Sequence, residues 1–274
     1  MFTTLIDGAT LLSRGREPGW IAMDCRAALG DLDYGRNAYR EGHVPGARYA
    51  DLDRDLVGPP GKRGRHPLPG REALAGRFAA WGIRHGDQLV AYDDAGGQFA
   101  CRFWWLARWL GLESCAVLDG GLAAYLDAGG ELTREVPLVD SSAFLPGPPL
   151  TRVVEADAII AAGSALTLID ARAGPRYRGE EEPIDRVVGH IPGALSYPCA
   201  DNLDAGGRFR RGARRFDALA GHDVVSYCGS GVTATHNILA MVDAGLAEPA
   251  LYPGSWSEWI EDPDRPIATV GRGE

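Results

Sequence analysis

Gly42-His43-Val44-Pro45-Gly46-Ala47 and Gly189-His190-Ile191-Pro192-Gly193-Ala194 are two nearly identical blocks, and they decide how the chain is organised. Each block follows an apolar segment that ends in Asp-x-Arg-Ala, at Asp24 in one half and at Asp170 in the other. Three more pairs of segments repeat in the same order, namely 5–12 with 153–160, 88–92 with 223–227, and 117–122 with 251–256. A long repeat that keeps its order indicates two copies of one fold.

Each half alternates short apolar strands with helical patterns, which is typical of α/β units around a mainly parallel sheet flanked by helices. We expect short amphipathic helices at 5–12 and 153–160, longer helices at 101–110 and 234–244, and strands at 88–92 and 223–227. The segment 131–150 is proline-rich and irregular, which favours a linker. The predicted domains are therefore 1–130 and 151–274, joined by a linker at 131–150.

Composition excludes several classes of protein. The formal net charge of −9 is unfavourable for broad electrostatic binding of nucleic acid. The chain shows neither a secretory signal nor an apolar stretch long enough to cross a membrane, so we expect a cytoplasmic protein without a membrane partner. Lys62 is the only lysine, so an anion would have to be bound by arginine or by backbone amides.

The five cysteines occur at irregular spacing, with no Cys-x-x-Cys pair and no zinc-ligand pattern. The sequence therefore predicts no disulfide framework, no metal site and no organic cofactor. Four cysteines lie in or beside apolar segments and are expected to be buried, inert core residues. These are Cys25, Cys101, Cys115 and Cys199.

The remaining cysteine, Cys228, follows a predicted strand and opens a small-residue loop before a helix. In parallel α/β sheets, ligands bind at this end of the strands. A tight turn into a helix directs backbone N–H groups and the positive end of the helix dipole at its centre, which favours a thiolate. Gly229 and Gly231 leave room for close backbone approach and for a positive φ. Cys228 is therefore the predicted nucleophile.

Two comparisons limit the reactions that the cysteine loop could catalyse. Asp93 occupies the equivalent place in the first half and cannot act as this nucleophile, so the first domain is predicted to be catalytically silent. Cysteine-dependent phosphatases need an arginine six residues after the cysteine, whereas position 234 is alanine. The loop also lacks the Gly-Lys-Ser/Thr ending of a nucleotide-binding loop. Phosphate chemistry is disfavoured.

The tandem halves, the Gly-His-x-Pro-Gly-Ala blocks, the Cys-Gly-Ser-Gly-Val-Thr loop and the segment 254–259 together resemble the rhodanese family of tandem-domain sulfurtransferases. Within that family, the chain is most similar to the members that take sulfur from 3-mercaptopyruvate. The resemblance spans about residues 5–265. It implies that Cys228 takes a sulfur atom as a persulfide and passes it to a thiol, such as that of thioredoxin, or to cyanide.

The resemblance also implies roles for other residues. The backbone amides of Gly229, Gly231, Val232 and Thr233 would cradle the persulfide. Arg176 and Arg186 would bind the donor's carboxylate, with Arg186 requiring a one-residue gap in the alignment. Three further residues would form a catalytic set in which His66, oriented by Asp53, manages a proton on Ser230 or on the substrate. The alternative for His66 is an ordinary histidine in a basic surface loop.

Three alternatives stay open at this point. The loop after Cys228 carries no charge, which favours a donor whose charge lies farther away on a carboxylate, so 3-mercaptopyruvate is preferred over thiosulfate. Thiosulfate sulfurtransferase is the second candidate. A sulfur-carrying or regulatory module without rapid turnover is the third. His43 and His190 occur in both halves, which argues for a structural role.

Overall fold

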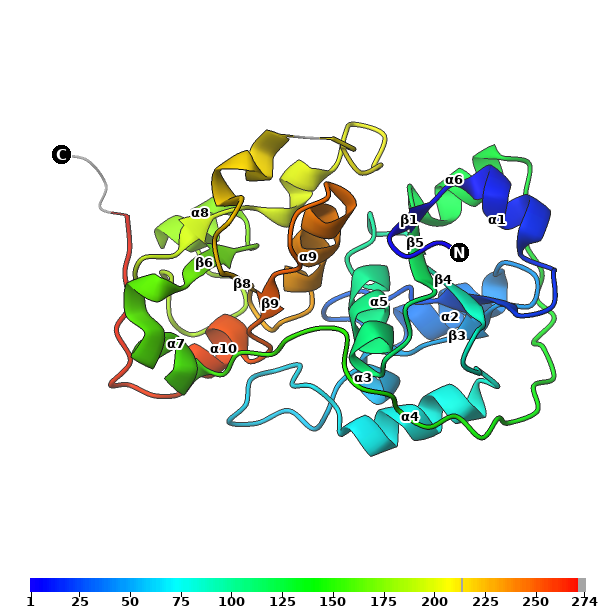
Figure 1. Ribbon diagram of the computed structural model, residues 1–274, viewed down its shortest axis with the longest axis horizontal. Helices are drawn as coiled ribbons and strands as arrows, with labels where there is room; N and C mark the ends of the chain where they lie inside the picture. Colours follow the sequence, from blue (N-terminus) through cyan, green and yellow to red (C-terminus); the bar gives the residue numbers. More distant parts are fainter. Residues whose placement is uncertain (213, 271–274) are drawn as a thin grey trace. The chain divides into compact units, whose positions relative to one another are not determined.

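The computed structural model describes residues 1–212 and 214–270. The chain forms two compact units, each containing one sheet (Figure 1). The first unit comprises residues 1–58, 68–151 and 205–209, and the second comprises 59–67, 152–204 and 210–274. The division is discontinuous in sequence, because 59–67 belongs to the second unit although it lies within the first half of the chain.

The first unit has a five-stranded parallel sheet in the order β1-β5-β4-β2-β3. Its strands are β1 (Leu5–Ile6), β2 (Trp20–Asp24), β3 (Arg48–Tyr49), β4 (Gln88–Tyr92) and β5 (Cys115–Leu118). Its helices are α1 (Gly8–Arg14), α2 (Tyr34–Glu41), α3 (Leu52–Asp55), α4 (Arg71–Ala80), α5 (Ala100–Trp109) and α6 (Gly121–Asp127). Helix α5 packs along β4 and β5, and α1 lies beside α6.

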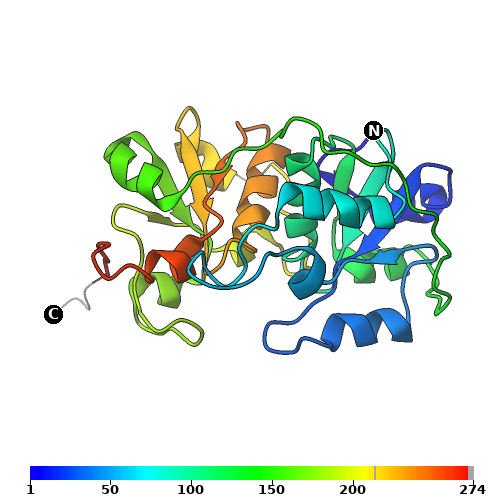
Figure 2. The same ribbon diagram turned by 90° about the horizontal axis from the view of Figure 1, so that it is seen from below.

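The second unit has a four-stranded parallel sheet in the order β7-β6-β8-β9. Its strands are β6 (Thr167–Asp170), β7 (Leu195–Ser196), β8 (Val224–Tyr227) and β9 (Ala250–Leu251). Its α-helices are α7 (Ala156–Ala162), α8 (Gly174–Arg178), α9 (Ala234–Asp243) and α10 (Ser255–Trp259), and 3₁₀ turns occur at Gly163–Ala165, Cys199–Asn202 and Arg214–Leu219. Helix α9 packs along β8 and β9, as α5 does along β4 and β5 (Figure 2).

The sheets confirm the predicted repeat, because β9-β8-β6-β7 matches β5-β4-β2-β3 strand for strand. One expectation was wrong: the segment at 5–12 is not entirely helical. Leu5 and Ile6 form a strand that pairs with Val117 and Leu118, and the helix begins only at Gly8. In the second half, Val153 makes a single parallel bridge to Leu251, and α7 begins at Ala156. These pairings join residues far apart in sequence, so local periodicity does not reveal them.

A buried ion pair fixes the Gly-His-x-Pro-Gly-Ala block in each unit. Arg172 donates to both carboxylate oxygens of Asp170 at the end of β6, and its Nη2 also donates to the carbonyl of Gly189 at 2.7 Å. Arg26 makes the same contacts with Asp24 and with the carbonyl of Gly42. Arg172 therefore has a structural role, since its side chain is paired and buried.

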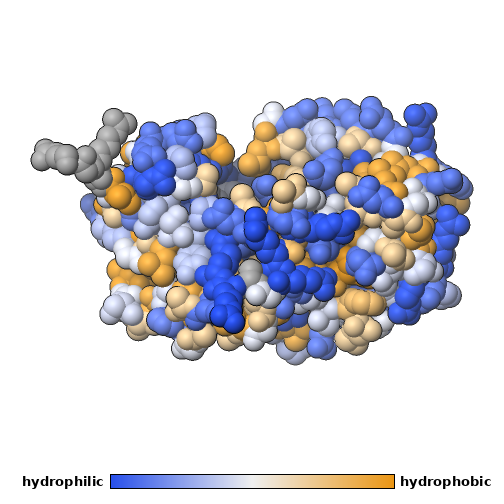
Figure 3. All heavy atoms as spheres, turned by 90° about the horizontal axis from the view of Figure 1, so that it is seen from above, coloured by the Kyte–Doolittle hydropathy of each residue, from blue (hydrophilic) through white to orange (hydrophobic). Residues whose placement is uncertain are grey.

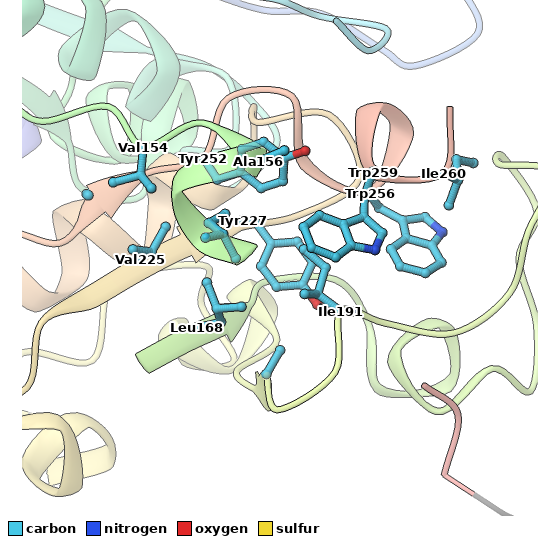
Figure 4. Packing of buried hydrophobic residues seen from close by; sticks show 13 residues of the cluster. Val154, Ala156, Leu168, Ile191, Val225, Tyr227, Tyr252, Trp256, Trp259 and Ile260 are labelled. Carbon is cyan, nitrogen blue, oxygen red and sulfur yellow. Dashed lines mark hydrogen bonds between the residues drawn. The ribbon is translucent and has the colours of Figure 1, made fainter. Parts of the chain in front are cut away.

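The core of the second unit lies directly behind the cysteine loop. Tyr227, Tyr252, Trp256 and Trp259 pack with aliphatic residues of β6, β8 and α7 (Figure 4). All four rings are at least 98% buried. Burial of an aromatic side chain contributes on the order of 2–3 kcal/mol, so the strand that ends at Tyr227 is held rigidly.

Hydrophilic and hydrophobic residues are intermixed over the face shown in Figure 3. Among the helices of the described residues, none is long and apolar enough to cross a membrane. The segment 131–150 contains no helix or strand, and it packs on the first unit through Phe144, which lies against Phe78.

Candidate active site

Cys228 lies at the carboxyl end of β8, and α9 begins six residues later at Ala234. The Sγ atom accepts the backbone N–H of Gly231 at 3.2 Å. Only 2% of the residue is exposed, so Cys228 is almost fully buried. The turn from strand to helix thus presents a backbone donor to the sulfur, as the sequence indicates.

Helix α10 holds the backbone of this loop. The Cys228 N–H donates to Ser255 Oγ at 3.1 Å, and the Trp256 N–H donates to the Cys228 carbonyl at 3.0 Å. The Ser257 N–H donates to the Gly229 carbonyl at 2.9 Å. Ser255 is the one described residue other than glycine with a positive φ, at 55°. Such a conformation costs free energy, and it commonly occurs at functional sites.

The two loop glycines are required for different reasons. Gly231 has φ +77°, and a Cβ on it would lie 2.3 Å from the carbonyl oxygen of Pro253. Gly229 does not have a positive φ, but a Cβ there would lie 3.0 Å from Arg65 Nη2 and 3.4 Å from Arg176 Nη2. Gly229 therefore lies close to two guanidinium groups.

Ser230 and His66 are hydrogen-bonded, with 2.7 Å between Ser230 Oγ and His66 Nδ1. Both residues belong to the second unit, because 59–67 is part of it. Ser230 is 7% exposed and His66 is half-buried. The contact joins the cysteine loop to a basic segment 164 residues earlier in the chain.

Arg65 and Arg176 share the carboxylate of Asp185. Arg65 Nη1 pairs with Asp185 Oδ1, and Arg176 Nη2 lies 3.2 Å from Asp185 Oδ2. Arg176 Nη2 also lies 2.6 Å from Glu182, which in turn pairs with Arg172. Burial lowers the pKa of Arg65, and the negative charge of a Cys228 thiolate acts in the opposite direction. The Arg65 guanidinium and the Cys228 sulfur are thus close enough to interact electrostatically.

The other predicted site residues lie in three places. Val232 is buried in the loop, and Thr233 immediately precedes α9. Arg186 pairs with Glu261 at 2.6 Å, donates to the Ile260 carbonyl and lines a cavity of about 250 Å³. Asp53 belongs to α3 of the first unit, where burial and then the neighbouring charge of Asp51 raise its pKa.

In the first unit, the loop equivalent to the cysteine loop binds the side-chain carboxylate of Asp93. Asp93 Oδ1 accepts the N–H groups of Ala95 and Gly97 at 2.9 and 2.8 Å, and Oδ2 accepts those of Phe99 and Ala100 at 2.8 and 2.9 Å. Four donors converge on one buried anionic side chain. The repeated turn is therefore suited to surround an anion with backbone amides.

The other cysteines and the paired histidines have structural surroundings. Burial raises the pKa of Cys25 and Cys115, and it raises that of Cys199 to about 12. His43 stacks on Tyr39, and His190 stacks on Tyr177, with ring centroids 3.8 and 3.9 Å apart. Each histidine also hydrogen-bonds the backbone carbonyl of the same tyrosine. The structural interpretation of this histidine pair is supported.

Sequence reasoning missed three contributors to the site: Arg65, Asp185 and Ser255. In the sequence, Arg65 is one of several basic residues in the segment before His66. A signal was present in its position directly before His66, but nothing local connects that segment with Asp185. Among the described residues, no group of three or more His, Cys, Asp or Glu side chains is placed to hold a metal ion.

The chain is an α/β protein with two copies of one domain, and only the second copy carries the cysteine loop. This combination is typical of one class of enzymes, and comparison with known proteins shows which family it is. The rhodanese-like domain matches twice, at residues 9–128 and 153–262. The chain belongs to the rhodanese family, which confirms the resemblance and the tandem fold.

Individual relatives cover nearly the whole chain. A probable 3-mercaptopyruvate sulfurtransferase of Pseudomonas aeruginosa is 47% identical, over 97% of this chain and 98% of its own length. A thiosulfate sulfurtransferase of Azotobacter vinelandii is 32% identical, over 96% of both chains. The crystal structure of the Escherichia coli 3-mercaptopyruvate sulfurtransferase has a TM-score of 0.79 at 28% identity, covering 94% of this chain and 100% of that one.

Proposed function

We propose that this protein is a 3-mercaptopyruvate sulfurtransferase that works through a persulfide on Cys228. The observation that carries the proposal is the position of the Cys228 sulfur, which accepts a backbone N–H in a turn between strand and helix. The 47% identity to a relative named for this activity supports the choice of donor.

The reaction has two half-reactions. In the first, the Cys228 thiolate attacks the donor's sulfur, forming an S–S bond while the C3–S bond of 3-mercaptopyruvate breaks. The bonding electrons pass to C3 as the enolate of pyruvate, which then takes a proton. In the second, an acceptor thiolate or cyanide attacks the outer sulfur and restores the Cys228 thiolate, releasing a persulfide or thiocyanate. This is nucleophilic covalent catalysis by an activated thiol.

Ser230 and His66 are the proposed proton carriers. The 2.7 Å contact between Ser230 Oγ and His66 Nδ1 allows the hydroxyl to exchange a proton with the imidazole. Ser230 follows Cys228 by two residues in the loop, and we propose that its hydroxyl supplies the proton that the enolate takes. We also propose, from the resemblance, that Asp53 favours the productive tautomer of His66.

Backbone amides of 229–233 would stabilise the negative charge on the outer sulfur of the persulfide. Support comes from the four N–H groups that surround Asp93 in the equivalent turn of the first unit. Arg176 is proposed to bind the donor's carboxylate, because its guanidinium group lies above Gly229. Arginine offers a carboxylate two parallel donors.

The test is mass spectrometry of the whole protein after incubation with 3-mercaptopyruvate and no acceptor. We expect a gain of one sulfur atom on Cys228, no gain in Cys228→Ser, and its loss when a dithiol or reduced thioredoxin is added. The same gain in Cys228→Ser would refute the assignment of the nucleophile.

Thiosulfate as the principal donor is the second candidate, because a relative of that name is 32% identical. The ratio of kcat/KM values for the two donors, with cyanide as acceptor, decides between them. We expect 3-mercaptopyruvate to be favoured. If Cys228 forms the persulfide but neither donor supports repeated turnover with any thiol acceptor, the protein is a sulfur carrier instead.

A further inference from the structure

His66 lies on a segment from the first half of the chain, so tertiary contacts decide where it sits relative to the cysteine loop. The segment 59–67 belongs to the second unit. Its turn is closed by two backbone hydrogen bonds, from the Gly61 N–H to the Gly64 carbonyl at 3.1 Å and from the Gly64 N–H to the Gly61 carbonyl at 2.9 Å. Two residues beyond this turn, the His66 imidazole bonds Ser230. The position of the imidazole therefore depends on how the turn is fixed.

Ser257, in α10, holds this segment by its main chain. Its Oγ accepts the backbone N–H of Arg65, the residue directly before His66, at 3.1 Å. The segment approaches α10 closely at this point, because a Cβ on Gly64 would lie 2.8 Å from Ser257 Oγ. Arg65 also pairs with Asp185, but through a long side chain with several rotatable bonds. The hydrogen bond to Ser257 instead fixes the backbone next to His66.

Ser257 is connected to the cysteine loop as well. Its backbone N–H donates to the carbonyl of Gly229 at 2.9 Å, and its hydroxyl donates to the carbonyl of Gly254 at 3.1 Å. A serine hydroxyl can donate one hydrogen bond and accept another at the same time, so its bonds to Gly254 and to the Arg65 N–H are compatible. The residue is 5% exposed. Ser257 thus joins the loop of the nucleophile to the backbone that precedes the imidazole.

The equivalent position of the first unit is occupied by alanine. The repeat places Ala123 opposite Ser257 and Gly121 opposite Ser255. The backbone supports this alignment, because Gly121 and Ser255 both have a positive φ, of 59° and 55°. Alanine has no hydroxyl, so its side chain cannot accept a backbone N–H. The hydroxyl at this position is therefore specific to the copy that carries the nucleophile.

The first unit holds a segment from the second half of the chain in a different way. Residues 205–209 belong to this unit, and the backbone N–H of Phe209 donates to Asp119 Oδ1 at 2.8 Å. Asp119 corresponds in the repeat to Pro253, whose side chain has no acceptor. In each unit, a side chain thus accepts a main-chain N–H of the segment that comes from the other half. In the catalytic unit, that side chain belongs to a residue that also bonds the cysteine loop.

We infer that Ser257 is a positioning residue for the proposed proton carrier His66. The inference rests on the proposed function and identifies what places the imidazole opposite Ser230. The Ser257 hydroxyl fixes the backbone before His66, and the Ser257 N–H fixes the loop that contains Ser230. Both partners of the 2.7 Å contact are therefore anchored on one residue. Without the hydroxyl, the imidazole occupies a wider range of positions, and proton transfer slows because it requires hydrogen-bond distance.

The test is a double-mutant cycle that combines Ser257→Ala with His66→Ala, with steady-state kinetics on 3-mercaptopyruvate. Ser257→Ala should lower kcat about 10-fold, which is less than the loss expected on removing the imidazole, and should change KM by less than about 2-fold. In the His66→Ala background, the same substitution should have almost no further effect, because the group that Ser257 positions is already absent.

The reactivity of Cys228 separates a positioning role from a general loosening of the loop. Alanine keeps the backbone N–H that bonds Gly229, so iodoacetamide should alkylate Cys228 in Ser257→Ala at a rate within about 2-fold of wild type. Ser13→Ala is the matched control, because the Ser13 hydroxyl also donates to a carbonyl three residues earlier, at 3.1 Å, but lies exposed on α1. This control should leave kcat unchanged.

Each of three results would overturn the inference: an unchanged kcat in Ser257→Ala, an equal loss of kcat in the wild-type and His66→Ala backgrounds, or a slowing of Cys228 alkylation by the same factor as kcat. A wild-type kcat in His66→Ala would overturn it as well, because Ser257 would then position a group that the reaction does not use. In all these cases the persulfide on Cys228 still forms, so the proposed sulfur transfer stands. Failure of the wild type to form the persulfide refutes the proposed function itself.

Discussion

The backbone N–H of Cys228 donates to the hydroxyl of Ser255 at 3.1 Å, and that hydroxyl donates in turn to the carbonyl of Tyr252 at 2.9 Å. Ser255 is fully buried and has a φ of 55°. The side chain thus satisfies a buried donor of the nucleophile at the cost of an unfavourable backbone conformation. The strained backbone and the hydrogen-bonding hydroxyl both belong to Ser255. Alanine removes only the hydroxyl, whereas glycine removes the hydroxyl and the strain, so the two substitutions separate the two effects.

Ser255→Ala should destabilise the protein by about 1–3 kcal/mol, because it leaves a buried N–H without its acceptor. Ser255→Gly removes the same hydroxyl but adopts a positive φ readily, so it should be more stable than the alanine variant by about 1 kcal/mol. Both should form the Cys228 persulfide more slowly than wild type. Urea unfolding and the rate of persulfide formation measure the two effects. Equal stability of the two variants would contradict the strain argument.

His66→Ala and Ser230→Ala should each lower kcat by about 10²-fold, the usual contribution of a general acid–base group. Because the two side chains act through one hydrogen bond, the double variant should be little slower than either single variant. Steady-state kinetics with 3-mercaptopyruvate provide the measurement. Losses that multiply in the double variant would mean that the residues act independently.

Asp93→Ala should destabilise the first unit by about 3 kcal/mol or more, since it leaves four buried N–H groups unpaired. Asp94→Ala, at the exposed neighbouring position, is the matched control and should change stability by no more than about 0.5–1 kcal/mol. Thermal or urea unfolding distinguishes them. If Asp93→Ala unfolds at the same urea concentration as wild type, water replaces the carboxylate at little cost.

Brief treatment of the native protein with iodoacetamide at pH 8 should modify Cys228 first. A thiol reacts as its thiolate, and burial raises the pKa of Cys199 to about 12, so Cys199 stays protonated at this pH even though its side chain is partly accessible. Peptide mass spectrometry locates the label. Raising the pH towards 12 should bring in Cys199, and equal labelling of both at pH 8 would contradict the assignment.

The sequence predicts well whatever depends on neighbours along the chain. Cys228 and Asp93 could be matched because each follows a strand and precedes a small-residue turn. Leu5 and Ile6 were assigned to a helix because a two-residue strand has no periodicity of its own. Arg65 was missed because its partner Asp185 lies 120 residues away, and only tertiary packing joins them.

The second unit includes residues 59–67, so it depends on a segment from the first half of the chain. A fragment that starts at the predicted boundary, residue 151, would retain the nucleophile, its turn and all four strands of the second sheet. It would lack the His66 imidazole that bonds Ser230, and it would lack the guanidinium of Arg65, one of the two near Gly229. The second half of the chain is therefore not an independent copy of the fold. Its site needs residues 59–67, which come from the first half of the sequence, and it is incomplete without them.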